Sequence, residues 1–288
     1  MIRAATRLAV VVGDPVAASL SPAIHAAAFA AAGADWAYGA VRVRPGGMPG
    51  FVRAMRALPV SGASVTMPHK AAAAALADLA DDDVRLLGAA NTLSLDAAGR
   101  IRARSTDGEG ARDALAAAGA SIAGARAVVI GAGGTAASVV LALARAGAEV
   151  AVVNRTAARA AELARAVSGA VAGARVRDAG MDAVGDADVV VHATPVGMGA
   201  DESPVPRSAW RAGQTVLDAV YHPLDTRALR EARAAGATVV DGLEMLVRQA
   251  ALQQREWIDR TPDVAAMRRA ATDELARRRT NSRGGDHR

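Results

Sequence analysis

A glycine-rich turn between an apolar run and a helix-period stretch is the feature that most constrains what this chain can fold into. The apolar run Val128–Ile130 leads directly into Gly131-Ala132-Gly133-Gly134-Thr135-Ala136, which has the spacing G-x-G-x-x-A. Gly131 permits a tight turn, and Gly133 lets the backbone approach a pyrophosphate at the start of the next helix. A lone G-x-G also occurs in ordinary turns, but its place between a strand and a helix favours a dinucleotide-binding Rossmann unit.

The residues after the next predicted strand, Glu149–Val153, indicate which dinucleotide binds. NAD sites usually carry an Asp or Glu about 20 residues after the glycine-rich turn, where it binds the ribose 2′-hydroxyl. Here Asn154, Arg155 and Thr156 stand at that place, with Arg159 one helical turn further. An arginine can bind a 2′-phosphate through two parallel hydrogen bonds, so the pattern favours NADP. The alternative is that both arginines are ordinary surface residues.

Apolar runs alternate with helix-period stretches along the chain, which is typical of α/β proteins with parallel sheets. A length of 288 residues suggests two domains of ordinary size. Before residue 119, strands are predicted at 8–12, 37–43, 62–66, 92–95 and 101–103, and helices at 22–32, 48–57, after Pro68 and at 108–118. After residue 124, strands are predicted at 125–130, 149–153, 188–191, 215–217 and 238–240, and helices at 135–146, 157–167, 226–235, 243–258 and after Pro262.

Composition and charge exclude several classes of protein. There is no cysteine, which rules out disulfides and cysteine-bound metals and agrees with a cytoplasmic location. No apolar run reaches the roughly 20 residues of a membrane span. The net charge is +5, but residues 268–288 hold seven arginines against three acidic residues, so the rest is close to neutral and does not indicate a nucleic-acid surface. His25, His192 and His222 show no metal-binding spacing, and we expect no metal.

One lysine stands out in an arginine-rich chain. Lysine and arginine together number 34, and only Lys70 is a lysine. An ammonium can exchange its proton near neutral pH, whereas a guanidinium stays charged, so a single lysine suggests a position that arginine cannot fill. Lys70 follows a predicted strand, and ligands of open α/β sheets bind at the carboxyl ends of strands.

Other polar residues lie near strand ends in the same half of the chain. Ser19 and Ser21 precede a predicted helix, whose N-terminus is a natural place for a carboxylate. The alternative is that one of them is only an N-cap serine. Asn91-Thr92 and Ser105-Thr106-Asp107-Gly108 come further along.

In these blocks the chain resembles the shikimate dehydrogenase family. The resemblance runs in order from about Ala9 to Ile258, and nine ordered blocks are more specific than a single Rossmann turn. The blocks are Gly13-Asp14-Pro15-Val16 with Ser19-x-Ser21-Pro22, Val65-Thr66-x-Pro68-x-Lys70, Asn91-Thr92, Thr106-Asp107-Gly108, Gly131-Ala132-Gly133-Gly134, Asn154-Arg155-Thr156, Ala193-Thr194-Pro195-x-Gly197-Met198, Asp218-x-Val220-Tyr221-x-Pro223-x-x-Thr226 and Asp241-Gly242-Leu243-x-Met245-Leu246-x-x-Gln249-Ala250.

The resemblance implies a role for each block. A catalytic Lys–Asp pair falls on Lys70 and Asp107, so the chain's single lysine is the residue that the family makes catalytic. The implied substrate-binding residues are Ser19 and Ser21 for a carboxylate, and Ser64, Thr66, Asn91, Tyr221 and Gln249 for the ring and its hydroxyls. The implied cofactor-binding residues are Gly131, Ala132, Gly133, Gly134, Thr135, Ala136, Asn154, Arg155, Thr156, Arg159 and Gly242, with Thr194, Pro195, Gly197 and Met198 beside the nicotinamide.

The family further implies NADP-dependent, reversible reduction of 3-dehydroshikimate to shikimate in the cytoplasm. Lys70 would protonate the carbonyl oxygen as the hydride arrives, and Asp107 would fix the ammonium. We expect an N-terminal α/β substrate domain with a mainly parallel sheet, formed by residues 1–114 with 242–288, and a Rossmann domain formed by residues 115–241. The C-terminal helices are expected to return to the first domain.

Two departures from the family pattern bear on substrate choice. Many members carry asparagine where Ser64 and Ser105 stand. Ser64 has a shorter reach, so one contact with a substrate hydroxyl is expected to run through water, and Ser105 is expected to cap or orient Asp107. His69, beside Lys70, is expected to point away, because neighbours on an extended segment face opposite ways.

Other functions stay open from the sequence alone. They are a relative that acts on quinate or aminoshikimate, and an NADP-binding paralogue without turnover. The sequence also leaves open whether the chain forms a homodimer.

Overall fold

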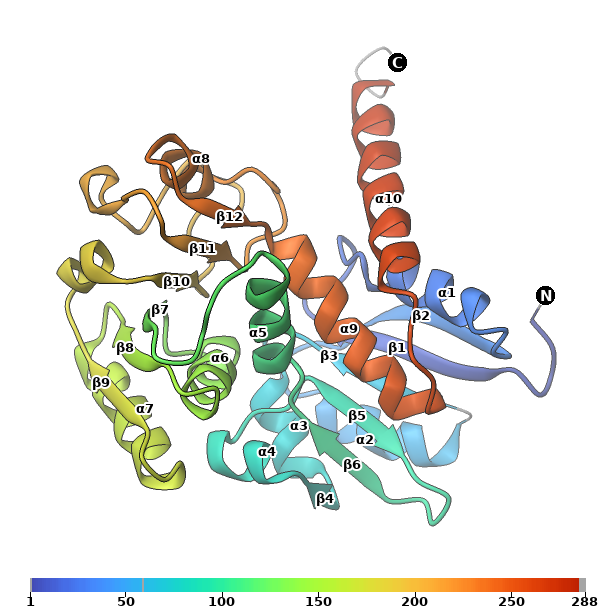
Figure 1. Ribbon diagram of the computed structural model, residues 1–288. Helices are drawn as coiled ribbons and strands as arrows, with labels where there is room; N and C mark the ends of the chain where they lie inside the picture. The colour runs from blue at the N-terminus through green and yellow to red at the C-terminus, as the bar shows by residue number, and fades with distance from the viewer. Residues whose placement is uncertain (1, 59, 285–288) are drawn as a thin grey trace. The chain divides into compact units, whose positions relative to one another are not determined.

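The computed structural model describes residues 2–58 and 60–284 (Figure 1). Contacts between Cα atoms divide the chain into two units, Met1–Ser105 with Ala250–Arg288, and Thr106–Gln249. This division groups residues 106–114 and 242–249 with the second unit, whereas the domain boundaries predicted above place them in the first. Those boundaries concern functional domains and stay a prediction.

The first unit is built on a mixed six-stranded sheet in the order β2-β1-β3-β5-β6-β4 (Figure 1). Parallel pairs join β1 to β2, β1 to β3 and β4 to β6, whereas β5 runs antiparallel to both β3 and β6. The expectation of a mainly parallel sheet is therefore confirmed. The strands are β1 (Arg7–Gly13), β2 (Trp36–Arg42), β3 (Val60–Val65), β4 (Leu79–Ala80), β5 (Thr92–Leu95) and β6 (Ile101–Arg104).

Short helices follow the strands of this sheet. They are α1 (Ser21–Ala31), α2 (Met48–Ala57), α3 (Lys70–Leu76) and α4 (Asp82–Leu87). In α2 the buried residues Met48, Val52 and Met55 recur at helical spacing, and they pack with Val10 and Val12 of β1 in one apolar cluster. The element α4 and the two-residue β4 were not predicted, because each is too short for a periodic signal.

The last helices of the chain pack on the first unit, as predicted. They are α9 (Gly242–Ile258), whose end belongs to this unit, and α10 (Val264–Gly284). The indole of Trp257 donates to the carbonyl of Leu93 on β5 at 3.2 Å. Gly62 of β3 makes room for the same ring, since a Cβ there would lie 2.6 Å from it. Arg278 of α10 donates to the carbonyl of Ala18 at 2.7 Å.

The second unit holds an all-parallel sheet in the order β12-β11-β10-β7-β8-β9, the strand order of a Rossmann fold. Its helices are α5 (Asp107–Ala117), α6 (Gly134–Arg145), α7 (Ala157–Ala170) and α8 (Arg227–Ala234), with two short 3₁₀ segments, Met181–Asp186 and Arg207–Ala209. Its strands are β7 (Arg126–Ile130), β8 (Glu149–Val153), β9 (Arg175–Asp178), β10 (Val189–His192), β11 (Thr215–Asp218) and β12 (Thr238–Val240).

Edge position explains why the sequence did not reveal β9. Three of its four residues, Arg175, Arg177 and Asp178, are exposed, and only Val176 is half-buried. An edge strand has one neighbour and needs few apolar residues, so it lacks the buried run by which the central strands were predicted.

Within residues 2–58 and 60–284, no helix combines the length and apolar character needed to cross a membrane.

Candidate active site

The glycine-rich turn has the geometry that a bound pyrophosphate requires. Gly131 has a φ of +124°, and a Cβ there would lie 2.9 Å from the carbonyl oxygen of Ala193, so both conformation and space demand glycine. Gly133 precedes α6, and a Cβ built on it would meet nothing within 4 Å. The N-cap residue is this glycine, which has no side chain to cap the helix. A helix N-terminus that follows an open glycine suits an anion.

The residues after β8 fit a phosphorylated ribose. The amide nitrogen of Asn154 donates to the carbonyl of Thr156 at 3.0 Å, which closes the turn into α7. Arg155 and Arg159 are exposed, and residues 154–159 include no carboxylate. Two exposed guanidinium groups without a neighbouring acid in this segment suit a 2′-phosphate better than a 2′-hydroxyl.

The loop Thr194–Met198 lies against the glycine-rich turn. The amide of Ala193 donates to the carbonyl of Ile130 at 2.9 Å, so the β10–β7 ladder continues up to this loop. The loop turns through Gly197, which has a φ of +87°, and the amide of Met198 donates to the carbonyl of Pro195 at 3.0 Å. Gly242, the remaining predicted cofactor residue, opens α9 close to Val220, whose carbonyl oxygen would lie 2.5 Å from a Cβ.

In the first unit, Lys70 and Asn91 are brought together by the backbone. Lys70 is the first residue of α3 and half-buried, and its carbonyl accepts from the amide of Ala90 at 2.9 Å. The carbonyl of Asn91 accepts from Val65 at 2.7 Å, which ties the end of β3 to the start of β5. Thr66, directly after β3, is half-buried. These polar residues therefore share one end of the sheet.

Ser64 belongs to a chain of side-chain hydrogen bonds. The phenol of Tyr38 donates to Ser64 at 2.7 Å, and the Ser64 hydroxyl donates to Oε1 of Gln253 at 2.7 Å. The Gln253 amide then donates to the carbonyl of Asn91 at 3.0 Å and to the hydroxyl of Thr92 at 3.1 Å. Because its proton is used by Gln253, Ser64 can act toward a substrate only as an acceptor.

Tyr38 and Gln253 were not singled out in the sequence. Burial raises the pKa of Tyr38 well above its ordinary value, so the phenol stays protonated and remains a donor. A signal for Gln253 existed, because it stands four residues after Gln249 on the same face of α9.

Ser19 and Ser21 lie at the N-terminus of α1. The hydroxyl of Ser19 accepts from the amide of Ser21 at 3.2 Å, and Ser21 is buried as the first helical residue. The N-cap residue is Leu20, which has no side-chain capping bond, so neither serine is the N-cap. Both hydroxyls therefore lie at a helix end that carries a positive dipole.

Asp107 begins α5 in the second unit and is 7% exposed. The hydroxyl of Thr135, from the glycine-rich turn, donates to Oδ2 of Asp107 at 3.1 Å. A residue predicted to bind the cofactor thus also contacts the carboxylate predicted to be catalytic. Gln249 accepts from the hydroxyl of Thr106 at 3.3 Å, and Tyr221 is half-buried in the same unit.

The histidines of the first unit take structural positions. His69 is 3% exposed, and its Nε2 lies 2.6 Å from the carbonyl oxygen of Val43, which holds the ring in the protein interior. His25 is fully buried and stacks on Tyr38 with ring centroids 4.3 Å apart. Burial lowers the pKa of His25 to about 3, and Gln253 opposes that shift. Among the residues described, no group of three or more His, Asp or Glu is arranged to hold a metal.

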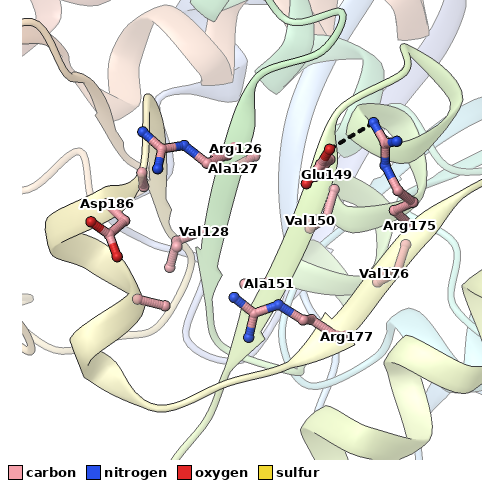
Figure 2. A pocket seen from close by; sticks show the side chains of 12 residues that line it. Arg126, Ala127, Val128, Glu149, Val150, Ala151, Arg175, Val176, Arg177 and Asp186 are labelled. Atoms are coloured by element: carbon pink, nitrogen blue, oxygen red, sulfur yellow. Dashed lines mark ion pairs between the residues drawn. The ribbon is translucent and has the colours of Figure 1, made fainter.

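A hollow of about 320 Å³ lies on the sheet of the second unit (Figure 2). Arg126, Glu149 and Arg175 line it at the first residues of β7, β8 and β9, and Arg175 pairs with Glu149 at 2.7 Å. It therefore sits at the amino ends of the strands. Gly131 and Asn154 follow the carboxyl ends, where parallel sheets bind ligands.

The all-parallel sheet in Rossmann order and the glycine-rich turn before α6 define a dinucleotide-binding protein. Three family models match the chain: the shikimate dehydrogenase substrate binding domain over residues 11–93, shikimate/quinate 5-dehydrogenase over 113–198 and the shikimate 5′-dehydrogenase C-terminal domain over 242–272. The chain belongs to the shikimate dehydrogenase family.

Individual relatives agree over nearly the whole length. The shikimate dehydrogenase (NADP(+)) of Methanosarcina mazei is 40% identical over 272 residues, covering 92% of this chain and 97% of the relative. A shikimate 5-dehydrogenase of Thermus thermophilus, solved with NADP(H) and shikimate, has a TM-score of 0.87 at 37% identity and covers 93% of this chain and 99% of its own. A quinate dehydrogenase of Corynebacterium glutamicum, solved with NAD, has a TM-score of 0.85 at 30% identity, with coverage of 93% and 99%.

Proposed function

We propose that this chain catalyses the reversible, NADP-dependent reduction of 3-dehydroshikimate to shikimate, a step toward chorismate and the aromatic amino acids. The likeness to the Methanosarcina shikimate dehydrogenase (NADP(+)), at 40% identity across 92% of the chain, carries this proposal. NADP is the cofactor, and the carboxylate-free segment with Arg155 after β8 supports that choice. The cytoplasmic location and the homodimer considered above stay predictions.

The substrate is bound by polar residues with separate tasks. Ser19 and Ser21 hold its carboxylate, and the N-terminal dipole of α1 favours the negative charge. The residues that recognise the ring and its hydroxyls are Ser64, Thr66, Asn91, Tyr221 and Gln249. Ser64 contributes only as an acceptor, because its proton is committed to Gln253 at 2.7 Å.

Lys70 and Asp107 handle the proton of the reaction. Bound NADPH supplies the hydride. The ammonium of Lys70 donates a proton to the carbonyl oxygen during reduction and accepts it back during oxidation. Asp107 orients the ammonium and accepts from a neighbouring substrate hydroxyl. Thr135 restrains this carboxylate through its hydrogen bond at 3.1 Å, which keeps the acceptor oxygens in place.

Arg155 is proposed to bind the 2′-phosphate of NADP. Arg155→Ala is expected to raise KM for NADP⁺ about tenfold and to change KM for NAD⁺ less than about twofold, because only NADP carries the phosphate. Initial rates with each dinucleotide measure both constants. Arg165→Ala is the matched control, since Arg165 is also exposed and lies on α7. An equal loss with both dinucleotides would show that Arg155 does not select the phosphate.

The main alternative is a preference for quinate, because the Corynebacterium quinate dehydrogenase matches this fold about as well, with a TM-score of 0.85. The deciding experiment follows NADP⁺ reduction by absorbance with shikimate, quinate and aminoshikimate. We expect kcat/KM to be at least tenfold higher for shikimate. A preference for either other substrate refutes the assignment and directs attention to Ser64 and Ser105. Tight NADPH binding without turnover of any of them identifies a non-catalytic paralogue.

A further inference from the structure

A buried histidine and aspartate in the second unit have no part in the mechanism above. His192 is the last residue of β10 and Asp218 the last of β11, and their Cα atoms are direct partners in the parallel ladder. Each side chain is 1% exposed, and Nδ1 of His192 lies 2.9 Å from Oδ1 of Asp218. Two polar side chains withdrawn from water in this way need fixed partners.

The carboxylate of Asp218 is held from the side of α8. The hydroxyl of Thr226 donates to its Oδ2 at 2.7 Å, and the amide of Val220 donates to its Oδ1 at 3.0 Å. Thr226 also caps α8 by accepting from the amide of Leu229 at 3.3 Å. These bonds anchor the carboxylate to two separate segments, so it forms a rigid base for the imidazole.

The imidazole of His192 links the fixed carboxylate of Asp218 to the hydroxyl of Thr194. The Asp218 carboxylate accepts from Nδ1, so that nitrogen carries the proton, and in the neutral ring Nε2 is the acceptor. Nε2 lies 2.5 Å from the hydroxyl of Thr194, which therefore donates to it. The Thr194 oxygen in turn accepts from the amide of Val196 at 3.3 Å. Both hydrogen-bonding functions of this hydroxyl are thereby assigned.

Thr194 begins the loop Thr194–Met198, which lies directly against the glycine-rich turn. The methyl group of Thr194 would lie 3.2 Å from a Cβ on Gly131. Val196 is held to Thr194, and Gly197 completes the turn with a φ of +87°. The orientation of Thr194 therefore sets the course of the backbone on that side of the cofactor site.

We propose that His192 and Asp218 are positioning residues that hold Thr194, and through it the loop Thr194–Met198, in the conformation that receives the nicotinamide half of the cofactor. The proposal rests on the proposed function and on the family resemblance, which implies that this loop lies beside the nicotinamide. It assigns no covalent step to the Thr–His–Asp chain. The adenosine half, bound near Arg155, does not depend on these residues.

Two conservative variants test the proposal. Thr194→Val keeps the shape of the side chain and removes only the hydroxyl. His192→Asn keeps an amide donor for Asp218 near the place of Nδ1 but cannot reach Thr194, so the buried carboxylate stays satisfied. Fluorescence titration then measures the Kd of NADPH and, by displacement, that of adenosine 2′,5′-bisphosphate, which lacks the nicotinamide half.

Each variant is expected to raise the Kd of NADPH about tenfold and the Kd of the bisphosphate less than about twofold. The double variant should bind NADPH no more weakly than the single variant with the higher Kd, since each substitution already removes the hydrogen bond between Thr194 and His192. Thr194→Ser restores the hydroxyl and should recover most of the NADPH affinity. Ser203→Ala, which removes a hydroxyl bonded to the carbonyl of Val205 at 3.0 Å and to its amide at 3.2 Å, is the control for general loosening.

An equal loss of affinity for both ligands would show that the His–Asp pair only stabilises the strand ends, and it would overturn the proposal. Unchanged NADPH affinity in Thr194→Val would overturn it as well. A wild-type protein that binds NADPH but does not oxidise shikimate would refute the substrate assignment instead, and the binding comparison would still decide the role of His192.

Discussion

Replacing Lys70 with alanine is expected to lower kcat for shikimate oxidation about 1,000-fold, while the Kd of shikimate rises much less. A positioned acid–base group contributes roughly 100- to 10,000-fold to a proton-transfer step. The carboxylate is expected to stay anchored by Ser19 and Ser21, so the complex should still form. Lys70 opens α3, and alanine is a good helix former, so the fold should be kept.

Lys70→Arg is the sharper comparison for this prediction. It retains a positive charge near the substrate, but a guanidinium does not give up its proton near neutral pH. We therefore expect kcat close to that of Lys70→Ala. Steady-state NADP⁺ reduction and equilibrium binding of shikimate measure the two effects separately. If Lys70→Arg were nearly as active as the wild type, Lys70 would act only as a charge, and the proton would come from another group.

Replacing Gly108 with alanine is expected to lower the free energy of unfolding by about 3 kcal/mol, the upper end for overpacking a core. Gly108 is buried in α5, and a Cβ there would lie 2.0 Å from the carbonyl oxygen of Ser138 on α6. This carbonyl belongs to the backbone of α6, so it cannot move aside as a flexible side chain can. The two helices would have to separate, and the bond from the Gly108 amide to the Ser138 hydroxyl, now 2.8 Å, would break.

Gly169→Ala in α7 is the matched control, because a Cβ there would meet nothing within 4 Å. Alanine is favoured over glycine in helices by up to about 1 kcal/mol, so this variant should be neutral or slightly stabilised. Denaturant unfolding followed by circular dichroism compares the two. Equal stability of both variants would show that α5 and α6 can accommodate a methyl group at position 108 without loss of packing. Because Asp107 is the preceding residue, we also expect Gly108→Ala to lower kcat.

The local sequence pattern was sufficient to predict most of the strands and helices. The central strands β7, β8 and β10 are buried runs, and α2 has regular helical spacing, so each could be predicted from neighbouring residues alone. The elements that were missed, α4, β4 and β9, are short or polar. For β4 and β9, pairing with β6 and β8 supplies what the local sequence does not, whereas α4 spans only six residues, too few for a periodic signal.

The candidate site divides in the same way. The glycine-rich turn and the segment around Arg155 follow local rules of backbone conformation and charge, and the importance of Lys70 follows from its being the single lysine. The shared hydrogen bonds do not follow from any pattern. Ser64 meets Gln253 across 189 residues of sequence, and Thr135 meets Asp107 across 28. The catalytic and binding roles themselves stay predictions until the variants above are measured.

By itself, the sequence determined the order of the longer strands and helices, the dinucleotide-binding turn and the family of this protein, because these depend on residues close together in the chain or on motifs in a fixed order. Only the tertiary structure decided which polar groups satisfy one another: that Ser64 gives its proton to Gln253, and that His192, passed over in the sequence, bridges Asp218 and Thr194. The physical reason is that buried donors and acceptors must be paired, and their partners are chosen by packing in space rather than by distance along the chain.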